Sequence, residues 1–107
     1  MIAFGKEQKK IDLGGGVSRK ILAYDGKMMS VEVSFEAGAV GAPHSHPHEQ
    51  ISYVLEGKFE YTVNGEKYIL EKGDTYHTLP NVIHGVVALE KGVLIDIFTP
   101  IREDFLK

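Results

Sequence analysis

Apolar and polar residues alternate over most of the chain, in short runs that turn residues separate. At positions 30–35 the odd-numbered residues are apolar and the even-numbered ones polar, which is the period of a strand with one buried face. A two-residue period recurs at positions 50–55, 59–63 and 93–98. Only the last residues, 102–107, suit a turn of helix. The pattern therefore predicts an all-β fold.

Glycine-containing turns divide these runs at regular intervals. Asn64-Gly65 suits the positive φ angles of a tight hairpin, and the glycines at 14–16 separate an N-terminal strand from the rest of the chain. Further turns are expected at 36–38, 72–74 and 90–92. Many short strands with turn signals between them are typical of a sandwich or barrel.

Length and charge narrow the classes of protein to consider. A chain of 107 residues is one domain, 1–107, too short for two independent cores. The net charge of −3 argues against the basic surface that nucleic acid binding requires. The N-terminus has no long apolar run, so neither a signal peptide nor a membrane span is expected. The absence of cysteine fits a reducing compartment. We expect a cytoplasmic protein that binds neither nucleic acid nor membrane.

Histidines are concentrated in one short segment. His44 and His46 are two residues apart and would project on the same face of a strand. Pro47 interrupts strand pairing, so the segment should lie at an edge or rim. With Gln50 and the distant His84, these side chains can close a four-ligand site for one divalent metal ion.

Two histidines stand outside this set. His48 shares a face with His46 if the strand continues, so it is a rival ligand. His77 is expected on the surface or next to the ligands without binding the metal itself. Imidazole and amide ligands allow Zn, Ni, Fe, Mn or Co, and the identity of the metal stays open.

The spacing of the ligands resembles the first motif of the cupin superfamily, Gly-x5-His-x-His-x3–4-Glu-x6-Gly. The matching residues are Gly38, His44, His46, Gln50 and Gly57, with Gln in the place of Glu.

The second cupin motif, Gly-x5-Pro-x-Gly-x2-His-x3-Asn, is matched at Gly73 and His84. Leu79, Asn81 and Ala88 take the Pro, Gly and Asn places, and Asn tolerates the left-handed conformation better than most residues. The resemblance, over core motifs 38–57 and 73–88, implies a cupin jelly-roll β-barrel (double-stranded β-helix). It also implies a homodimer, since isolated cupins often pair through their sheets.

Gln50 changes the electrostatics of the predicted site. An amide oxygen carries no charge, so three neutral imidazoles and an amide leave the charge of a divalent ion uncompensated. Such a site should attract an anionic substrate and acidify bound water.

Asp96 is the second unusual residue, since it interrupts an apolar strand where an unpaired carboxylate is costly. It shares a face with Leu94 and Phe98. Either it lies at a barrel rim, satisfied by water or by Arg102, or it has a catalytic role.

The run Asp-x-Phe-x-Pro-x-Arg-x-Asp-Phe-Leu, which begins at Asp96, resembles the small pectin-degradation cupins of the KdgF type. That resemblance implies ketonisation of 4,5-unsaturated uronates released by pectin and alginate lyases. It assigns the catalytic places to Asp96, Phe98 and Arg102, and the unusual amide ligand to Gln50. The Arg102 guanidinium would offer a two-donor fork to the substrate carboxylate, Asp96 would move a proton, and Phe98 would supply an apolar wall.

Three alternatives compete with this non-redox isomerase. A cupin dioxygenase would use Fe at the same ligands, and another metal-dependent isomerase would act on a different substrate. A binding module would hold a small acid without turnover.

Overall fold

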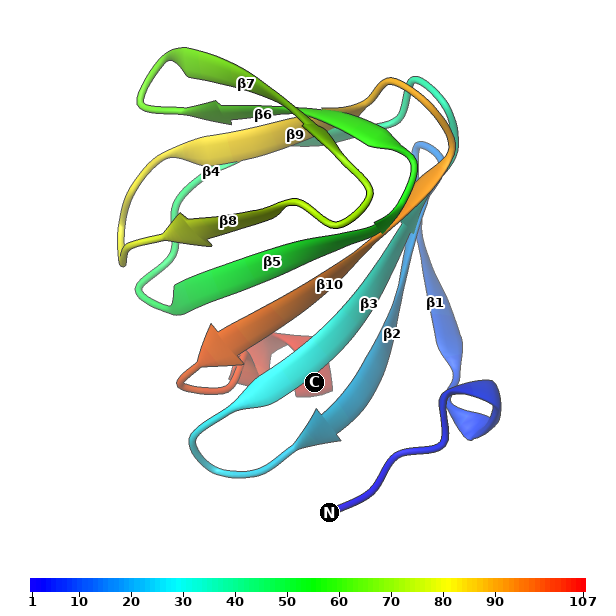
Figure 1. The fold of residues 1–107 in the computed structure, drawn as a ribbon. Coiled ribbons are helices and arrows are strands. Elements are labelled where there is room, and N and C mark those ends of the chain that lie inside the picture. Colours follow the sequence, from blue (N-terminus) through cyan, green and yellow to red (C-terminus); the bar gives the residue numbers. More distant parts are fainter.

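Ten strands form two antiparallel sheets that face each other (Figure 1). The computed structural model describes all 107 residues. The strands are β1 (Lys10–Gly14), β2 (Val17–Tyr24), β3 (Met29–Phe35), β4 (Val40–His44), β5 (Glu49–Glu56), β6 (Lys58–Val63), β7 (Glu66–Glu71), β8 (Thr75–Thr78), β9 (His84–Ala88) and β10 (Gly92–Thr99), with single 3-10 turns η1 (Gly5–Glu7) and η2 (Glu103–Leu106). The all-β prediction is confirmed, including a helical turn near the C-terminus.

The sheets have the orders β1-β2-β3-β10-β5-β8 and β4-β9-β6-β7. Strands distant in the chain are therefore neighbours, with β10 between β3 and β5 and β9 between β4 and β6. This interleaving brings the histidine-rich β4–β5 segment, the start of β9 and the end of β10 to one end of the barrel.

Apolar side chains fill the other end, between the two sheets. Phe59 is fully buried, and its ring meets Phe35 edge to face with centroids 5.2 Å apart. Val54, Ala88 and Leu94 are buried in the same cluster. Burial of such side chains contributes roughly 25 cal/mol per Å² of apolar surface, so this cluster holds the two sheets together.

Two asparagines occupy the left-handed region. Asn64 has φ 49° and the following Gly65 has φ 81°, as the predicted hairpin between β6 and β7 requires. Asn81 has φ 66°, at the place where the second motif has glycine. The expected substitution of Asn for Gly is confirmed there.

Strand β5 turns its polar residues inward. Gln50, Ser52 and Val54 are buried, whereas Ile51, Tyr53 and Leu55 are 52%, 42% and 39% exposed. Gln50 and Ser52 thus point toward the interior, and apolar side chains are exposed on the outer face of β5. Further across the same face of the sheet lie the charged Lys20 and Glu32.

The C-terminal turn η2 lies behind β10 and β3 in the view of Figure 1. Phe105 meets Phe98 of β10 edge to face, with ring centroids 5.8 Å apart, so the turn covers the inner face of the sheet. The helices are single turns, and none has the length and hydropathy to cross a bilayer.

Candidate metal centre and cavity

Three histidines converge at the end of the barrel where β4 and β9 pair. His44 and His84 are register partners on those strands. His46 joins them, and one ring nitrogen from each lies within 4.8 Å of the other two. His46 and His84 are buried, and His44 is exposed.

His46 does not lie in a strand, contrary to the expectation that His44 and His46 alternate along one. Strand β4 ends at His44, and residues 45–48 form a loop and bend before β5. Pro47 explains the break, since it lacks an N–H for the ladder and fixes its own φ. His46 reaches the other two imidazoles from this loop.

Each of the three imidazoles is oriented by a backbone carbonyl. The Nδ1 atoms of His44, His46 and His84 donate to the carbonyls of Ala42, His48 and Val82 at 2.8, 3.0 and 2.9 Å. A proton on Nδ1 leaves the Nε2 lone pair free in a neutral ring, which is the arrangement that presents Nε2 to a metal.

Gln50 is held by a chain of polar groups that ends at Asp96. Its Nε2 donates to the Ser52 hydroxyl at 2.9 Å, and that hydroxyl donates to Asp96 Oδ1 at 2.6 Å. A single hydroxyl has one proton, so its donation to Asp96 requires it to accept from the amide N–H. The amide oxygen of Gln50 is thereby directed toward the histidines.

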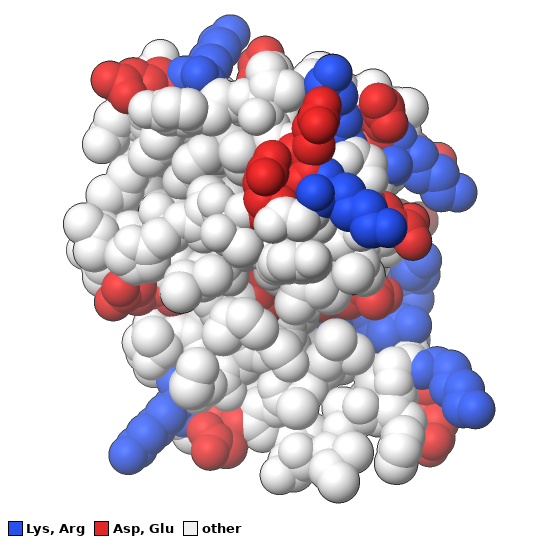
Figure 2. Space-filling view, viewed as in Figure 1, with Lys and Arg blue, Asp and Glu red and all other residues white.

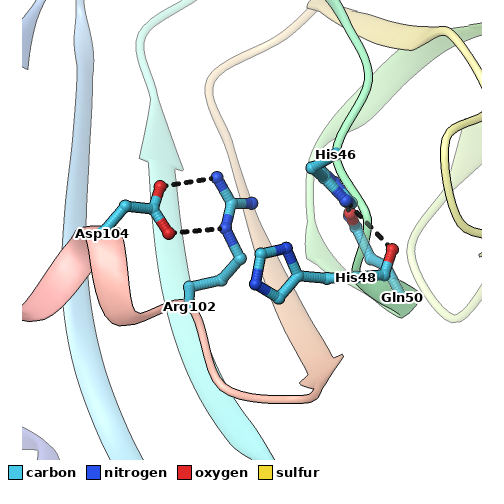
Figure 3. Close-up of polar contacts among 5 residues, drawn as sticks. All are labelled: His46, His48, Gln50, Arg102 and Asp104. Atoms are coloured by element: carbon cyan, nitrogen blue, oxygen red, sulfur yellow. Dashed lines mark hydrogen bonds and ion pairs between the residues drawn. The ribbon is translucent and has the colours of Figure 1, made fainter.

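Gln50 Oε1 and His46 Nε2 lie 3.0 Å apart (Figure 3). Burial, with positive charge on Arg102 and His84 adding to it, lowers the pKa of His46 to about 4. The ring is then neutral at pH 7, its one proton is on Nδ1, and two lone pairs face each other. A cation between them satisfies both, so the four residues fit a divalent metal.

Asp96 lies beside these ligands with limited access to solvent. Burial raises the pKa of this carboxyl to about 6, against the opposing effects of the Ser52 hydrogen bond and of Arg102. The sequence allowed Asp96 to be satisfied by Arg102; instead Ser52 donates to it, and Arg102 pairs with Asp104.

Three of the candidate ligands, His44, Gln50 and His84, line one cavity of about 250 Å³ together with Asp96, and His46 lies behind them. Val17, Val33 and Phe35 form an apolar part of its wall on the β2–β3 side, and Arg19 is the charged residue on that side. The lining includes His44, Gln50, His84, Asp96, Phe98 and Arg102 from the predicted set, together with Arg19, Tyr76 and Phe105.

Arg102 enters the cavity from the segment after β10. Its Nε and Nη2 donate to the two oxygens of Asp104 at 3.1 and 2.9 Å (Figure 3). The edge of the guanidinium formed by Nε and Nη2 is therefore occupied by Asp104. Only the N–H groups at the far end of the guanidinium remain free. Its Cζ lies 5.0 Å from the ring centroid of Phe98, which is buried.

The remaining histidines lie outside the group of three. His48 faces Phe98 with ring centroids 6.4 Å apart, and its buried Nδ1 has no hydrogen-bond partner. His77 is exposed on β8 and pairs with Glu49.

Sequence reasoning missed three cavity residues, Arg19, Tyr76 and Phe105, and Ser52, which bonds Gln50 and Asp96 behind the cavity wall. Arg19 and Ser52 each alternate with inward-facing residues of their strand, and that two-residue alternation was the available signal. Arg19 stands between Val17 and Ile21, and Ser52 between Gln50 and Val54. Tyr76 and Phe105 gave no signal distinct from core packing.

Comparisons with known proteins agree with this geometry. A family model described as "Cupin domain" matches residues 31–98. Pectin degradation protein KdgF of Dickeya dadantii is 52% identical over 97 residues, 89% of this chain and 88% of that protein. The structure of KdgF from Halomonas sp. superposes with a TM-score of 0.94 at 41% identity, covering 98% of this chain and 97% of that one. An RmlC-like cupin from Shewanella frigidimarina gives 0.94 at 42% identity, covering 97% and 94%.

Proposed function

This chain belongs to the cupin family, and from that premise we propose that it is a metal-dependent enzyme that opens and ketonises 4,5-unsaturated uronates from pectin or alginate breakdown. The observation that carries the proposal is that Asp96, held by Ser52, lines the same cavity as His44, His84 and Gln50, with His46 beside them. The high identity to a pectin degradation protein specifies the substrate class.

The metal would be held by His44, His46, His84 and the amide oxygen of Gln50. When bound, a divalent ion supplies positive charge that stabilises negative charge developing on the substrate. The ligand set carries no charge of its own, and Arg19 and Arg102 add positive charge to the cavity. Asp96 and the paired Asp104 are the opposing groups, so the site as a whole favours an anionic sugar.

The reaction rearranges protons without changing the formula of the sugar. The anomeric hydroxyl loses its proton while the bond between C1 and the ring oxygen breaks and that oxygen gains a proton, which leaves an aldehyde at C1 and an enol at C5. C4 then gains a proton as the enol hydroxyl loses one, which gives the ketone. No oxidant and no net water are required.

Asp96 is the group that moves these protons. Its pKa of about 6 makes it effective both as a base and as an acid near neutral pH. The Ser52 hydroxyl holds one carboxylate oxygen and leaves the other for substrate. Phe98 forms the wall beside it and excludes water, while the free end of the Arg102 guanidinium donates to substrate oxygen.

The proposal is tested with purified protein loaded with one divalent metal at a time. The unsaturated carboxylate absorbs ultraviolet light, and ketonisation removes the conjugated double bond. We expect the absorbance of 4,5-unsaturated galacturonate to fall faster with the protein than without it, and chelation to abolish the difference. Absorbance that decays equally with and without protein, for every unsaturated uronate and metal, would reject the proposal.

We also propose that the chain forms a homodimer in the cytoplasm. Ile51, Tyr53 and Leu55 are exposed on β5, and Ile95 and Ile97 of β10 are their neighbours in register. Figure 2 shows that part of the molecular surface carries no Lys, Arg, Asp or Glu, while charged side chains cluster in the upper right of that view. Neighbouring exposed apolar residues such as those of β5 are typical of a protein–protein interface.

A further inference from the structure

Arg19 is a charged residue on the inner face of β2. Its side chain lines the cavity beside Val17, whereas the next residue, Lys20, pairs with Glu32 at 3.9 Å. The Arg19 guanidinium lies over the ring of Phe105, with Cζ 3.8 Å from the ring centroid. Stacking of this kind fixes the plane of the guanidinium and leaves its terminal N–H groups available, while Nε is buried.

The Arg19 guanidinium has no anionic partner. No carboxylate lies within 4.0 Å of it, and its buried Nε has no hydrogen-bond acceptor. Burial lowers the pKa of Arg19, but a guanidinium stays charged at neutral pH. The side chain is partly buried, and the nearest opposing charge, Asp104, acts on it only from beyond 4.0 Å. A partly buried cation without an ion pair is a group that can receive an anion.

Arg102 differs from Arg19 in this respect. Asp104 already accepts from both Nε and Nη2 of Arg102. Of the two guanidiniums in the cavity, only Arg19 therefore has both terminal Nη groups free of an internal acceptor, and two parallel N–H donors match a carboxylate.

The position of Arg19 suits the far end of a sugar acid. Three strand intervals, β2 to β3 to β10 to β5, separate the strands of Arg19 and Gln50, about 14 Å at ~4.8 Å per interval. Arg19 is level with Val54 of β5, so Gln50 lies further along that strand. The long arginine side chain covers part of this span, and a six-membered ring with its carboxylate fits the rest. Asp96, on β10, lies between the two ends.

We propose that Arg19 binds the substrate carboxylate and thereby selects uronates over neutral sugars. The inference rests on the proposed function for its substrate class. In this assignment the two N–H donors that bind the substrate carboxylate belong to Arg19. Arg102 contacts other substrate oxygens with the part of its guanidinium that Asp104 leaves free.

The test compares binding of D-galacturonate and D-galactose, which differ in the carboxylate, to metal-loaded protein by NMR titration. Arg19→Met keeps an apolar stem on Phe105 and removes the fork. It should weaken galacturonate binding on the order of 10-fold and leave galactose binding unchanged. Arg19→Lys keeps the charge but has no pair of parallel donors, so its affinity for galacturonate should lie between those of wild type and Arg19→Met. This variant keeps the test valid if the Met variant does not fold. Lys20→Met removes the same charge from the opposite face and should match wild type.

Turnover separates this inference from the proposed function. If unsaturated galacturonate is a substrate, Arg19→Met should raise KM about 10-fold with kcat nearly unchanged. Turnover with an unchanged KM in Arg19→Met would overturn the role of Arg19 and leave the function intact. A wild-type protein that prefers galacturonate through Arg19 but fails to ketonise would overturn the function alone. Equal wild-type binding of the two sugars would overturn the role of Arg19.

Discussion

The orientation of one amide links the candidate metal ligands to the candidate proton carrier. The Ser52 hydroxyl donates a hydrogen bond to Asp96 and therefore accepts one from the Gln50 amide. The Gln50 oxygen then faces His46. A Glu in place of Gln50 would have no N–H to donate to Ser52. The Gln50 amide is thus matched to the carboxylate of Asp96, which is the register partner of Ser52 on the neighbouring strand β10. The replacement of the usual Glu by Gln has this local cause.

Ser52→Ala removes the hydroxyl that orients Gln50. We expect metal affinity to fall about 10- to 100-fold, as for other residues that orient metal ligands, because the amide can then rotate. Ser18→Ala, on the hairpin strand β2, is a matched control and should retain wild-type affinity. The measurement is competition for the metal against a chromophoric chelator. Wild-type affinity in Ser52→Ala would show that the amide needs no such support.

Asp96→Asn should change stability in a pH-dependent way. The native pKa of about 6 lies above the ordinary 3.8, so the folded state binds more protons than the unfolded state between these values, and stability falls as pH rises. Asp96→Asn has no carboxyl at this position, so its stability does not fall with pH for this reason. In metal-free protein its free energy of unfolding, relative to wild type, should rise from pH 4 to pH 7 by on the order of 2–3 kcal/mol. Urea melts at several pH values measure this, and a difference that is constant with pH would contradict it.

The same substitution should reduce turnover on the order of 10²-fold, while the nearly isosteric amide preserves the fold. Near-wild-type turnover of unsaturated galacturonate by Asp96→Asn would end its assignment as the proton-transfer group.

At the scale of elements, the two-residue period predicted the strands well, because each has one face toward the interior. The turns followed from glycine and asparagine, whose backbone angles the structure bears out at Asn64 and Asn81. The period could not show which face of β5 is inward. The apolar residues Ile51 and Tyr53 are exposed, since the interior at that level is a polar site.

Site residues were predictable where spacing is specific and not where they depend on pairing between distant strands. The histidines and Gln50 stand in a recognisable pattern, and Asp96 is conspicuous in an apolar strand. The partner of Arg102 depends on how the C-terminal turn folds back. The role of Arg19 depends on the pairing of β2 with β3. No residue pattern near Arg19 predicts that pairing.

The approach of β4 to β9 depends on Gly85, which adjoins His84. A Cβ at this position would lie 2.9 Å from the Gly41 carbonyl oxygen and 3.0 Å from Pro43 N. Gly85→Ala should therefore force the strands apart, cost roughly 1–3 kcal/mol of stability and weaken metal binding by separating His44 from His84. Gly5→Ala, where a Cβ meets nothing within 4 Å, is the control. Thermal melts and metal titration are the readouts, and wild-type values for both in Gly85→Ala would contradict the account.

At the scale of the whole molecule, exposed apolar residues of β5 adjoin Ile95 and Ile97 of β10 on the outside of the barrel. Ile51→Lys places a charge among them, and it should convert a dimer to a monomer because burying an unpaired charge is costly. Light scattering after gel filtration measures the mass. A wild-type monomer, or an Ile51→Lys variant that stays dimeric, would remove this face from consideration.

The most direct test of the account is the mass of the product formed from 4,5-unsaturated galacturonate by metal-loaded protein. An isomerisation predicts a product with the mass of the substrate, without the ultraviolet absorbance of the conjugated double bond. In deuterium oxide it should carry one carbon-bound deuterium at C4. A product heavier by two oxygen atoms would indicate a dioxygenase, and substrate recovered unchanged would indicate a binding module; either result would contradict the account.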